Sequence, residues 1–180
     1  MDILAHALWA GVGTTFAARR IPISRPTAVA TVALSTLPDL GQLLPLLVWV
    51  VAGDGTMATV EAFARASPGQ EPALPPLVSL ASHHLHCTMH SAVVASVVTL
   101  LLWLLLRKFW IPLAGWWSHI AIDVFTHSTA FYPVPVLYPI SYLGFDGVSW
   151  HQPWFQAINY AALALCMLGL FRTRQRRQTV

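Results

Sequence analysis

The segment from Leu77 to Leu106 holds about 30 residues and contains no Asp, Glu, Lys or Arg. A helix needs only about 20 apolar residues to cross the hydrocarbon core of a bilayer. The whole chain is 56% hydrophobic and 9% charged, whereas soluble domains carry about 25% charged residues. So few charges cannot cover a water-exposed surface, and the sequence therefore predicts an integral membrane protein.

The apolar segments predict an all-α fold, a polytopic membrane bundle of about five helices in a single domain over residues 1–180. The expected helices are Asp2–Ala18, Pro26–Val51, Leu77–Leu106, Ile111–Ser128 and Pro153–Phe171. Proline inside a helix removes a backbone hydrogen bond, so we expect the second helix to break around Leu37-Pro38-Asp39. The segment Ala52–Pro76 is expected to be a loop, and a short surface helix near Met57–Arg65 is compatible with it.

Basic residues follow the first, third and fifth expected helices, and basic residues near span ends mark the cytoplasmic side. They are Arg19, Arg20 and Arg25, then Arg107 and Lys108, and finally Arg172, Arg174, Arg176 and Arg177 in a tail over residues 172–180. Five crossings with an outward N-terminus place all of them inside. The loops Ala52–Pro76 and Thr129–Gln152, which hold most of the acidic residues, then face outward. We expect a multi-pass protein of the cell membrane with a cytoplasmic tail and no nucleic-acid partner.

Ionisable side chains inside the expected spans are candidates for function, because an unpartnered one is costly in a bilayer. They are Asp2, His6, Asp39, His83, His84, His86, His90, His119, Asp123 and His127. Several recur at a spacing of four, which places them on one face of a helix. These are Asp2 with His6, His86 with His90, and His119 with Asp123 and His127. Imidazole and carboxylate are common ligands of zinc.

Depth in the membrane links these residues. At about 1.5 Å of rise per residue, the central members lie about 17–26 Å from the basic cluster that ends each helix. They are His6, Asp39, His90, His119 and Asp123. Helices that alternate in direction therefore bring polar side chains to one level in the outer half of the bilayer, and the sequence predicts a metal site there.

The candidate residues are expected to have different roles. The predicted metal ligands are Asp2, His6, Asp39, His86, His90, His119 and Asp123, and the predicted catalytic groups are Asp39, Asp123 and His127. We expect His83 and His84 to face water, because they lie higher on their helix, and His151 to lie in a loop.

At these residues the chain resembles the bacterial membrane-bound metal-dependent hydrolase family (YdjM-like). The matching pieces are Met1-Asp2 with His6, Leu37-Pro38-Asp39, Met89-His90-Ser91, the run from Ser118 to Ser128, Tyr138-Pro139-Ile140-Ser141 and Gly147-Val148-Ser149-Trp150. The His-x3-Asp-x3-His element in the run from Ser118 to Ser128 is the most specific. Family members commonly have an arginine before the His-Ser pair, which this chain lacks, so either His84 or His86 aligns with the family's upstream histidine. The resemblance implies hydrolase activity.

The order of the candidate ligands is also distantly similar to that of zinc-dependent phospholipase C and the single-strand-specific zinc nucleases. These all-helical enzymes use an early histidine, an aspartate and two His-x3-Asp/Glu-type pairs around a zinc cluster. His6, Asp39, the pair His86/His90 and the pair His119/Asp123 follow that order here. The similarity implies phosphoester hydrolysis.

The favoured hypothesis is a hydrolase with two or three divalent ions, most simply zinc, acting on a lipid-like amphiphilic substrate at the outer leaflet. The lipid bilayer and that substrate are the expected partners. One alternative is a haem-binding electron-transfer protein, because paired histidines on membrane helices can ligate haem. A metal or proton transporter is the third hypothesis, and the nearly wholly apolar inner half of most expected helices argues against it.

Overall fold

The structure is a computed structural model that describes residues 1–178, apart from the side chains of residues 174 and 176–178. Within these residues the chain forms eight helices and no strand, which confirms the predicted all-α class. The helices are α1 (Ile3–Ala17), α2 (Arg25–Gly41), α3 (Leu44–Ala52), α4 (Met57–Arg65), α5 (Pro76–Met89), α6 (Ala92–Leu106), α7 (Leu113–Thr126) and α8 (Pro153–Gln178). Their number exceeds the expected five because two expected helices are each divided and because α4 forms within the loop Ala52–Pro76.

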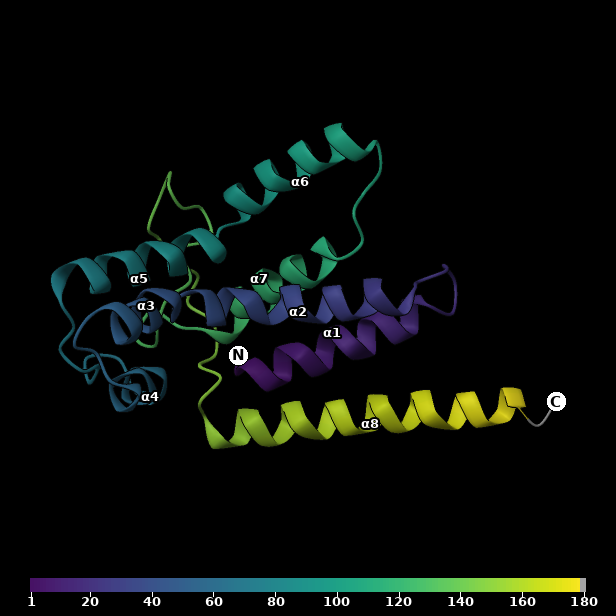
Figure 1. Ribbon diagram of the computed structural model, residues 1–180. Helices are drawn as coiled ribbons and strands as arrows, with labels where there is room; N and C mark the ends of the chain where they lie inside the picture. Colours follow the sequence, from purple (N-terminus) through teal and green to yellow (C-terminus); the bar gives the residue numbers. More distant parts are fainter. Residues whose placement is uncertain (179–180) are drawn as a thin grey trace.

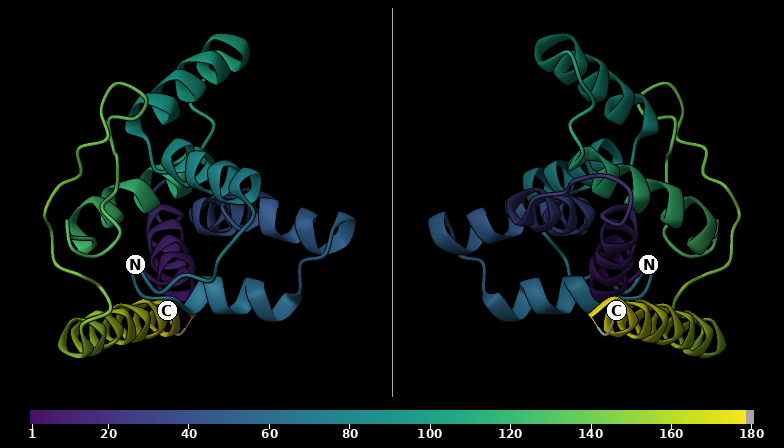
Figure 2. Two further views of the ribbon diagram at one scale, coloured as in Figure 1. Left: turned by 90° about the vertical axis from the view of Figure 1, so that its left-hand side faces the viewer. Right: turned by 90° about the vertical axis from the view of Figure 1, so that its right-hand side faces the viewer.

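Helix α2 lies at the centre of the fold, where it packs against α1, α5 and α7. Helix α8 runs alongside α1, and α6 leaves the bundle on the opposite side, as Figure 1 and Figure 2 show. The connection between α7 and α8, residues 127–152, runs along one side of the molecule (Figure 2). The helices α1, α2 and α7 therefore lie between the two apolar helices α6 and α8.

The second expected helix is divided later than predicted. The predicted break at Leu37-Pro38-Asp39 is wrong, because α2 continues through Pro38 to Gly41 and the 63° bend lies between α2 and α3. Pro45 occupies the first turn of α3, where a backbone N–H would have no partner within the helix in any case. At the bend, the Ser82 hydroxyl of α5 donates a hydrogen bond of 2.8 Å to the Gln42 carbonyl. The later bend leaves Asp39 near the end of α2.

The third expected helix is divided as well, so the prediction of one continuous helix over Leu77–Leu106 is wrong. Helix α5 ends at Met89, α6 begins at Ala92, and the two axes differ by 64°. The Ser91 hydroxyl caps α6 by accepting a hydrogen bond from the Val94 N–H at 3.1 Å. The Ala92 N–H donates to the Val136 carbonyl at 2.9 Å, so the connection after α7 satisfies a backbone group that the break leaves free. The break leaves His90 between the two helices, fully buried.

Membrane-spanning potential is concentrated in a few helices. In the described part of the chain, the segment Pro153–Thr173 of α8 is long and apolar enough to cross a membrane as a single helix. The bent pairs α2–α3 and α5–α6 bring the number to three if each is counted as one broken span, and α1 is apolar but shorter. Exposed apolar side chains such as Leu105 on α6 and Leu165 on α8 give these helices surfaces suited to lipid.

The basic segments gather at one end of the molecule. The α1–α2 connection, the α6–α7 connection and the C-terminal end of α8 lie towards the right of Figure 1, and α3, α4 and α5 lie towards the left. Arg19 and Arg20 lie in the α1–α2 connection, and Arg107 caps the C-terminus of α6. Of the predicted tail 172–180, residues 179–180 and the side chains of Arg174, Arg176 and Arg177 lie outside the described residues.

Gly115 of α7 sets the distance between α7 and α2, because a Cβ at this position would lie 1.9 Å from the Thr31 carbonyl oxygen. We expect Gly115→Ala to push the two helices apart and to lower the free energy of unfolding by about 1–3 kcal/mol, the usual cost of overpacking. Thermal melting in detergent measures the change. Gly11→Ala in α1 is the matched control, since a Cβ at that position would meet no atom within 4 Å. An unchanged melting temperature for Gly115→Ala would contradict the close approach of α2 and α7.

Candidate metal centre

Four buried or nearly buried side chains converge where α2, α7 and the α5–α6 break meet. They are Asp39, His90, His119 and Asp123, and one donor atom of each lies within 4.8 Å of all the others. His90, His119 and Asp123 are fully buried, and the Asp39 side chain is 16% exposed. Asp39 comes from α2, His90 from the break, and the other two from successive turns of α7. A group of two imidazoles and two carboxylates this compact could hold a metal ion.

The two histidines of this group point their Nε2 atoms at each other and at both carboxylates. The Nε2 atoms of His90 and His119 are 3.0 Å apart. Asp123 Oδ2 lies 3.5 Å from His90 Nε2 and 3.1 Å from His119 Nε2. Asp39 Oδ1 lies 3.6 Å and 3.8 Å from the same two nitrogens. Five polar contacts thus share one small volume inside an apolar bundle.

The hydrogen bonds of the Nδ1 atoms indicate which nitrogen of each ring carries the proton. His119 Nδ1 lies 2.8 Å from the Ser35 carbonyl, and His90 Nδ1 lies 2.8 Å from the His86 carbonyl. A carbonyl can only accept, so each Nδ1 carries the donated proton, and the Nε2 of the neutral ring has a free lone pair. Metal-binding histidines are oriented by the same kind of hydrogen bond from the non-ligating nitrogen. The lone pairs and the carboxylates therefore converge on a position suited to a cation.

A second set of groups surrounds the other oxygen of Asp123. His6 Nε2 of α1 lies 3.0 Å from Asp123 Oδ1, and the amino group of Met1 forms an ion pair with the same oxygen. His127, which caps α7, has its Nε2 3.2 Å from the Met1 nitrogen and 3.6 Å from Asp123 Oδ2. The Nδ1 of His127 donates to the Tyr132 carbonyl at 2.7 Å, the arrangement already seen for His90 and His119. Asp123 thus lies at the centre of all these contacts.

Several buried polar atoms in this region form no hydrogen bond of good geometry within the protein, although some lie close to an opposite charge. They are both ring nitrogens of His6, Nδ1 of His86, Oδ2 of Asp39 and Oδ2 of Asp123. Leaving such an atom without a hydrogen bond costs about 1–3 kcal/mol, more for a charged group. Their concentration around one point is consistent with a ligand-binding site rather than with a self-contained packing network.

The structure brings most of the predicted site residues together, and it separates one from them. Asp39, His90, His119 and Asp123 form the compact group, and His6 and His127 adjoin Asp123. His86 lies beside it, with its ring centroid 4.2 Å from that of His90. Asp2 lies outside: its Oδ1 accepts hydrogen bonds from the Ala5 N–H and the Tyr160 hydroxyl, so it caps α1 and ties it to α8.

The histidines that the sequence placed outside the site lie in the connections and on exposed surfaces. His83 and His84 are exposed, and their rings neighbour Tyr142 and Tyr138 respectively. His151 is exposed and stacks on Phe131.

Backbone groups at the site were not predicted. The Met1 amine and the carbonyls of Ser35, His86 and Tyr132 contact the central side chains. Every residue has a carbonyl, so its role carries no residue-type signal. The nearest hint is the spacing of Met1 and Asp2 before His6, which places the start of α1 beside that histidine.

Comparison of the chain with protein-family models, with curated proteins and with solved structures finds no match.

Metal binding should be measurable as stabilisation. At a free concentration 100 times Kd, a ligand of the native state adds about 2.7 kcal/mol, which for a chain of this size is about 5–10 °C in Tm. We expect Zn²⁺ to raise the melting temperature of chelator-treated protein by that amount, and His90→Ala to abolish the rise. His151→Ala, which removes an exposed imidazole, is the control and should respond as the wild type does. Equal responses of wild type and His90→Ala would contradict the site.

A hydrogen bond from the Tyr132 hydroxyl to Glu71 Oε1, 2.6 Å long, supports the loop that holds His127. It holds the pKa of the Glu71 carboxyl below its usual value of 4.5. A lowered pKa means that the carboxylate stabilises the fold above the unfolded pKa and that this contribution disappears as the pH falls. Glu71→Gln should therefore lower the melting temperature at pH 7, and the gap to wild type should close below about pH 4. Glu61→Gln, at an exposed pair with Arg65, should have little effect at either pH.

Proposed function

We propose that the protein is a membrane-bound metal-dependent hydrolase that cleaves a phosphoester in an amphiphilic, lipid-like substrate at the outer leaflet. The observation that carries the proposal is the buried group of Asp39, His90, His119 and Asp123 with its converging lone pairs. Those four residues would hold a divalent metal, which would supply a coordinated water of lowered pKa and a Lewis acid for a phosphoryl oxygen, the two effects that phosphoester hydrolysis needs.

Zinc is the proposed metal, because imidazole nitrogen and carboxylate oxygen in a compact arrangement are its usual ligands. Two ions are supported by the way the donors divide around Asp123. Its Oδ2 faces His90 and His119, and its Oδ1 faces His6. A carboxylate with donor groups at both oxygens would be suited to hold a pair of ions, and His127, 3.6 Å from Oδ2, and His86, beside His90, could supply further ligands.

The proton acceptor in the proposed reaction is Asp39. It is the one member of the compact group with measurable side-chain exposure, and its Oδ2 has no hydrogen bond within the protein. Asp123 is enclosed by the amine and the imidazoles, so it is suited to hold metal rather than to take up a proton. His127 contacts Asp123 and the Met1 amine, and it is proposed to orient both.

The membrane position of the site supports a lipid-like substrate. The Tyr160 hydroxyl of α8 donates to Asp2, which directly precedes α1. The end of α1 next to the site therefore lies level with a residue seven positions after the start of α8. At about 1.5 Å per residue this is about 10 Å from the start of that helix, within the outer half of a core about 30 Å thick. The gathering of the basic connections at one end supports a multi-pass arrangement with the site towards the outside.

The geometry gives less support to haem binding. Two axial histidines lie on opposite sides of the porphyrin plane, whereas here both Nε2 atoms share a space 4.8 Å across with two carboxylates. We propose the hydrolase over the electron-transfer protein for that reason.

The test of the proposed function is metal analysis followed by assay of the purified protein in detergent. Zinc-loaded wild type should hydrolyse bis(4-nitrophenyl) phosphate or a phospholipid, and His119→Ala and Asp123→Ala should lower the rate by about 100-fold or more, since even groups that only orient metal ligands are worth 10–100-fold. His151→Ala is the control and should keep the wild-type rate. Protein that takes up no metal, or full activity in both variants, would reject the proposal, and a haem absorption band would favour the alternative.

A further inference from the structure

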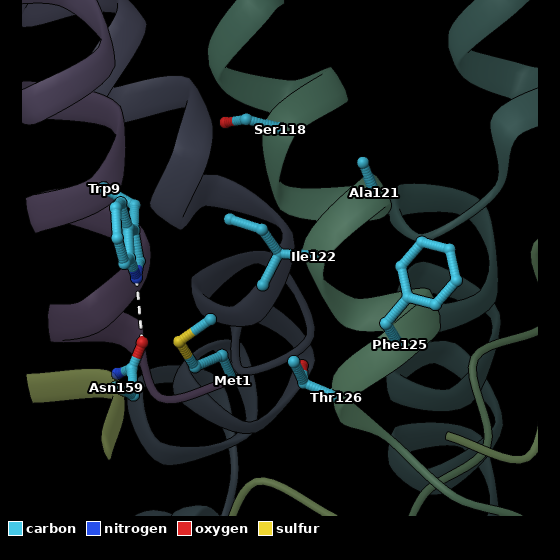
Figure 3. A pocket seen from close by; sticks show the side chains of 8 residues that line it. All are labelled: Met1, Trp9, Ser118, Ala121, Ile122, Phe125, Thr126 and Asn159. Carbon is cyan, nitrogen blue, oxygen red and sulfur yellow. Dashed lines mark hydrogen bonds between the residues drawn. The ribbon is translucent and has the colours of Figure 1, made fainter. Parts of the chain in front are cut away.

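A pocket of about 520 Å³ lies between α1, α7 and α8, next to the candidate metal centre. Its lining residues are Met1, Trp9, Ser118, Ala121, Ile122, Phe125, Thr126 and Asn159. In Figure 3, Trp9 and Asn159 lie on one side, Ser118, Ile122 and Thr126 on the other, and Met1 between them. The volume falls within the range of about 300–1,000 Å³ that is typical of small-molecule sites.

The pocket is continuous with the metal centre through two of its own lining residues. The Thr126 hydroxyl donates to Asp123 Oδ1 at 3.3 Å, and the Met1 amine pairs with the same oxygen. Both residues thus line the pocket and contact Asp123. A molecule that occupies the pocket therefore has one end beside the carboxylate at the centre of the site.

The lining is suited to hydrocarbon. Several of its polar groups already have partners within the protein: Trp9 Nε1 donates to Asn159 Oδ1 at 2.8 Å, and the Ser118 hydroxyl donates to the Gly115 carbonyl at 2.7 Å. The other lining residues include Met1, Ile122 and Phe125, whose side chains are apolar. A phosphate or sugar would find few free hydrogen-bonding groups here, whereas an alkyl chain would lose nothing by leaving lipid.

The pocket also lies where a lipid could enter it. Asn159 belongs to α8, the helix that can span a membrane by itself. Ala121 and Phe125 lie on the exposed side of α7, and Phe125 is 62% exposed. The opening between α7 and α8 therefore faces the part of the surroundings that lipid chains fill.

From this we infer that the pocket holds one hydrocarbon chain of the substrate, which enters sideways from the outer leaflet between α7 and α8. This inference rests on the proposed function, and it narrows the substrate to a long-chain phosphoester whose head group reaches the metal centre while its chain lies along α7.

The test fills the pocket. Ala121→Trp places a large side chain at an exposed position of α7, so the fold and the metal content should not change. We expect KM for dioleoylphosphatidylglycerol to rise about tenfold or more, because displacing even two methylenes costs that much. The rate with bis(4-nitrophenyl) phosphate, which has no chain, should stay at the wild-type value. Ala114→Trp is the matched control, since Ala114 is exposed on the same helix outside the pocket.

A binding readout separates the pocket from the chemistry. In nanodiscs, a phosphatidylglycerol with a diazirine in its acyl chain should label the peptide around Ile122, and Ala121→Trp but not Ala114→Trp should remove that label. Labelling that Ala121→Trp leaves intact, or an equal fall in the rates of both substrates, would overturn the inference. Specific labelling by a protein that cleaves neither substrate would support the pocket and reject the hydrolase.

Discussion

The fold is organised around one fully buried carboxylate, that of Asp123. An ionised carboxylate removed from water needs a close partner for its charge and for its hydrogen-bonding capacity. Here α1 supplies the His6 imidazole, the residue at the chain start supplies the Met1 amine, the α5–α6 break supplies His90, and α7 supplies His119 and His127. Helix α1, helix α7 and the α5–α6 break are therefore all tied to a single charged group.

The irregular features of the bundle follow from that requirement. In a continuous helix through His90, the Ser91 hydroxyl could not cap α6, and the Ala92 N–H could not donate to the Val136 carbonyl. The absence of a side chain at Gly115 lets α7 approach α2 until the Ser35 carbonyl reaches His119 Nδ1. The α5–α6 break and the close approach at Gly115 thus each bring one partner of Asp123, or the group that orients it, into place.

Much of this could be predicted from the sequence, and the reasons for the failures are physical. The spacing of four between His119 and Asp123 predicted a shared helix face, and counting depth from the basic clusters predicted which helices would contribute. The break at Ser91 was missed because local pattern does not distinguish a serine within a helix from a serine that caps one. At Ser91 the decision depends on Val136 and Tyr138, more than 40 residues away. Pro38 and Pro45 both resemble helix breakers, and only packing shows that Pro45 begins the next helix.

Protonation of the histidines alone does not give every buried polar atom of the site a hydrogen-bonding partner. With Nδ1 of His90, His119 and His127 each donating to a carbonyl, a proton on any Nε2 makes that ring a buried cation. One such proton can lie between the two Nε2 atoms that are 3.0 Å apart, and together with the Met1 ammonium it would balance Asp39 and Asp123. That state still leaves the His6 ring nitrogens and Oδ2 of Asp39 without hydrogen bonds. A metal ion at the shared position would replace protons there and accept the lone pairs that converge on it, so metal uptake should be linked to proton release.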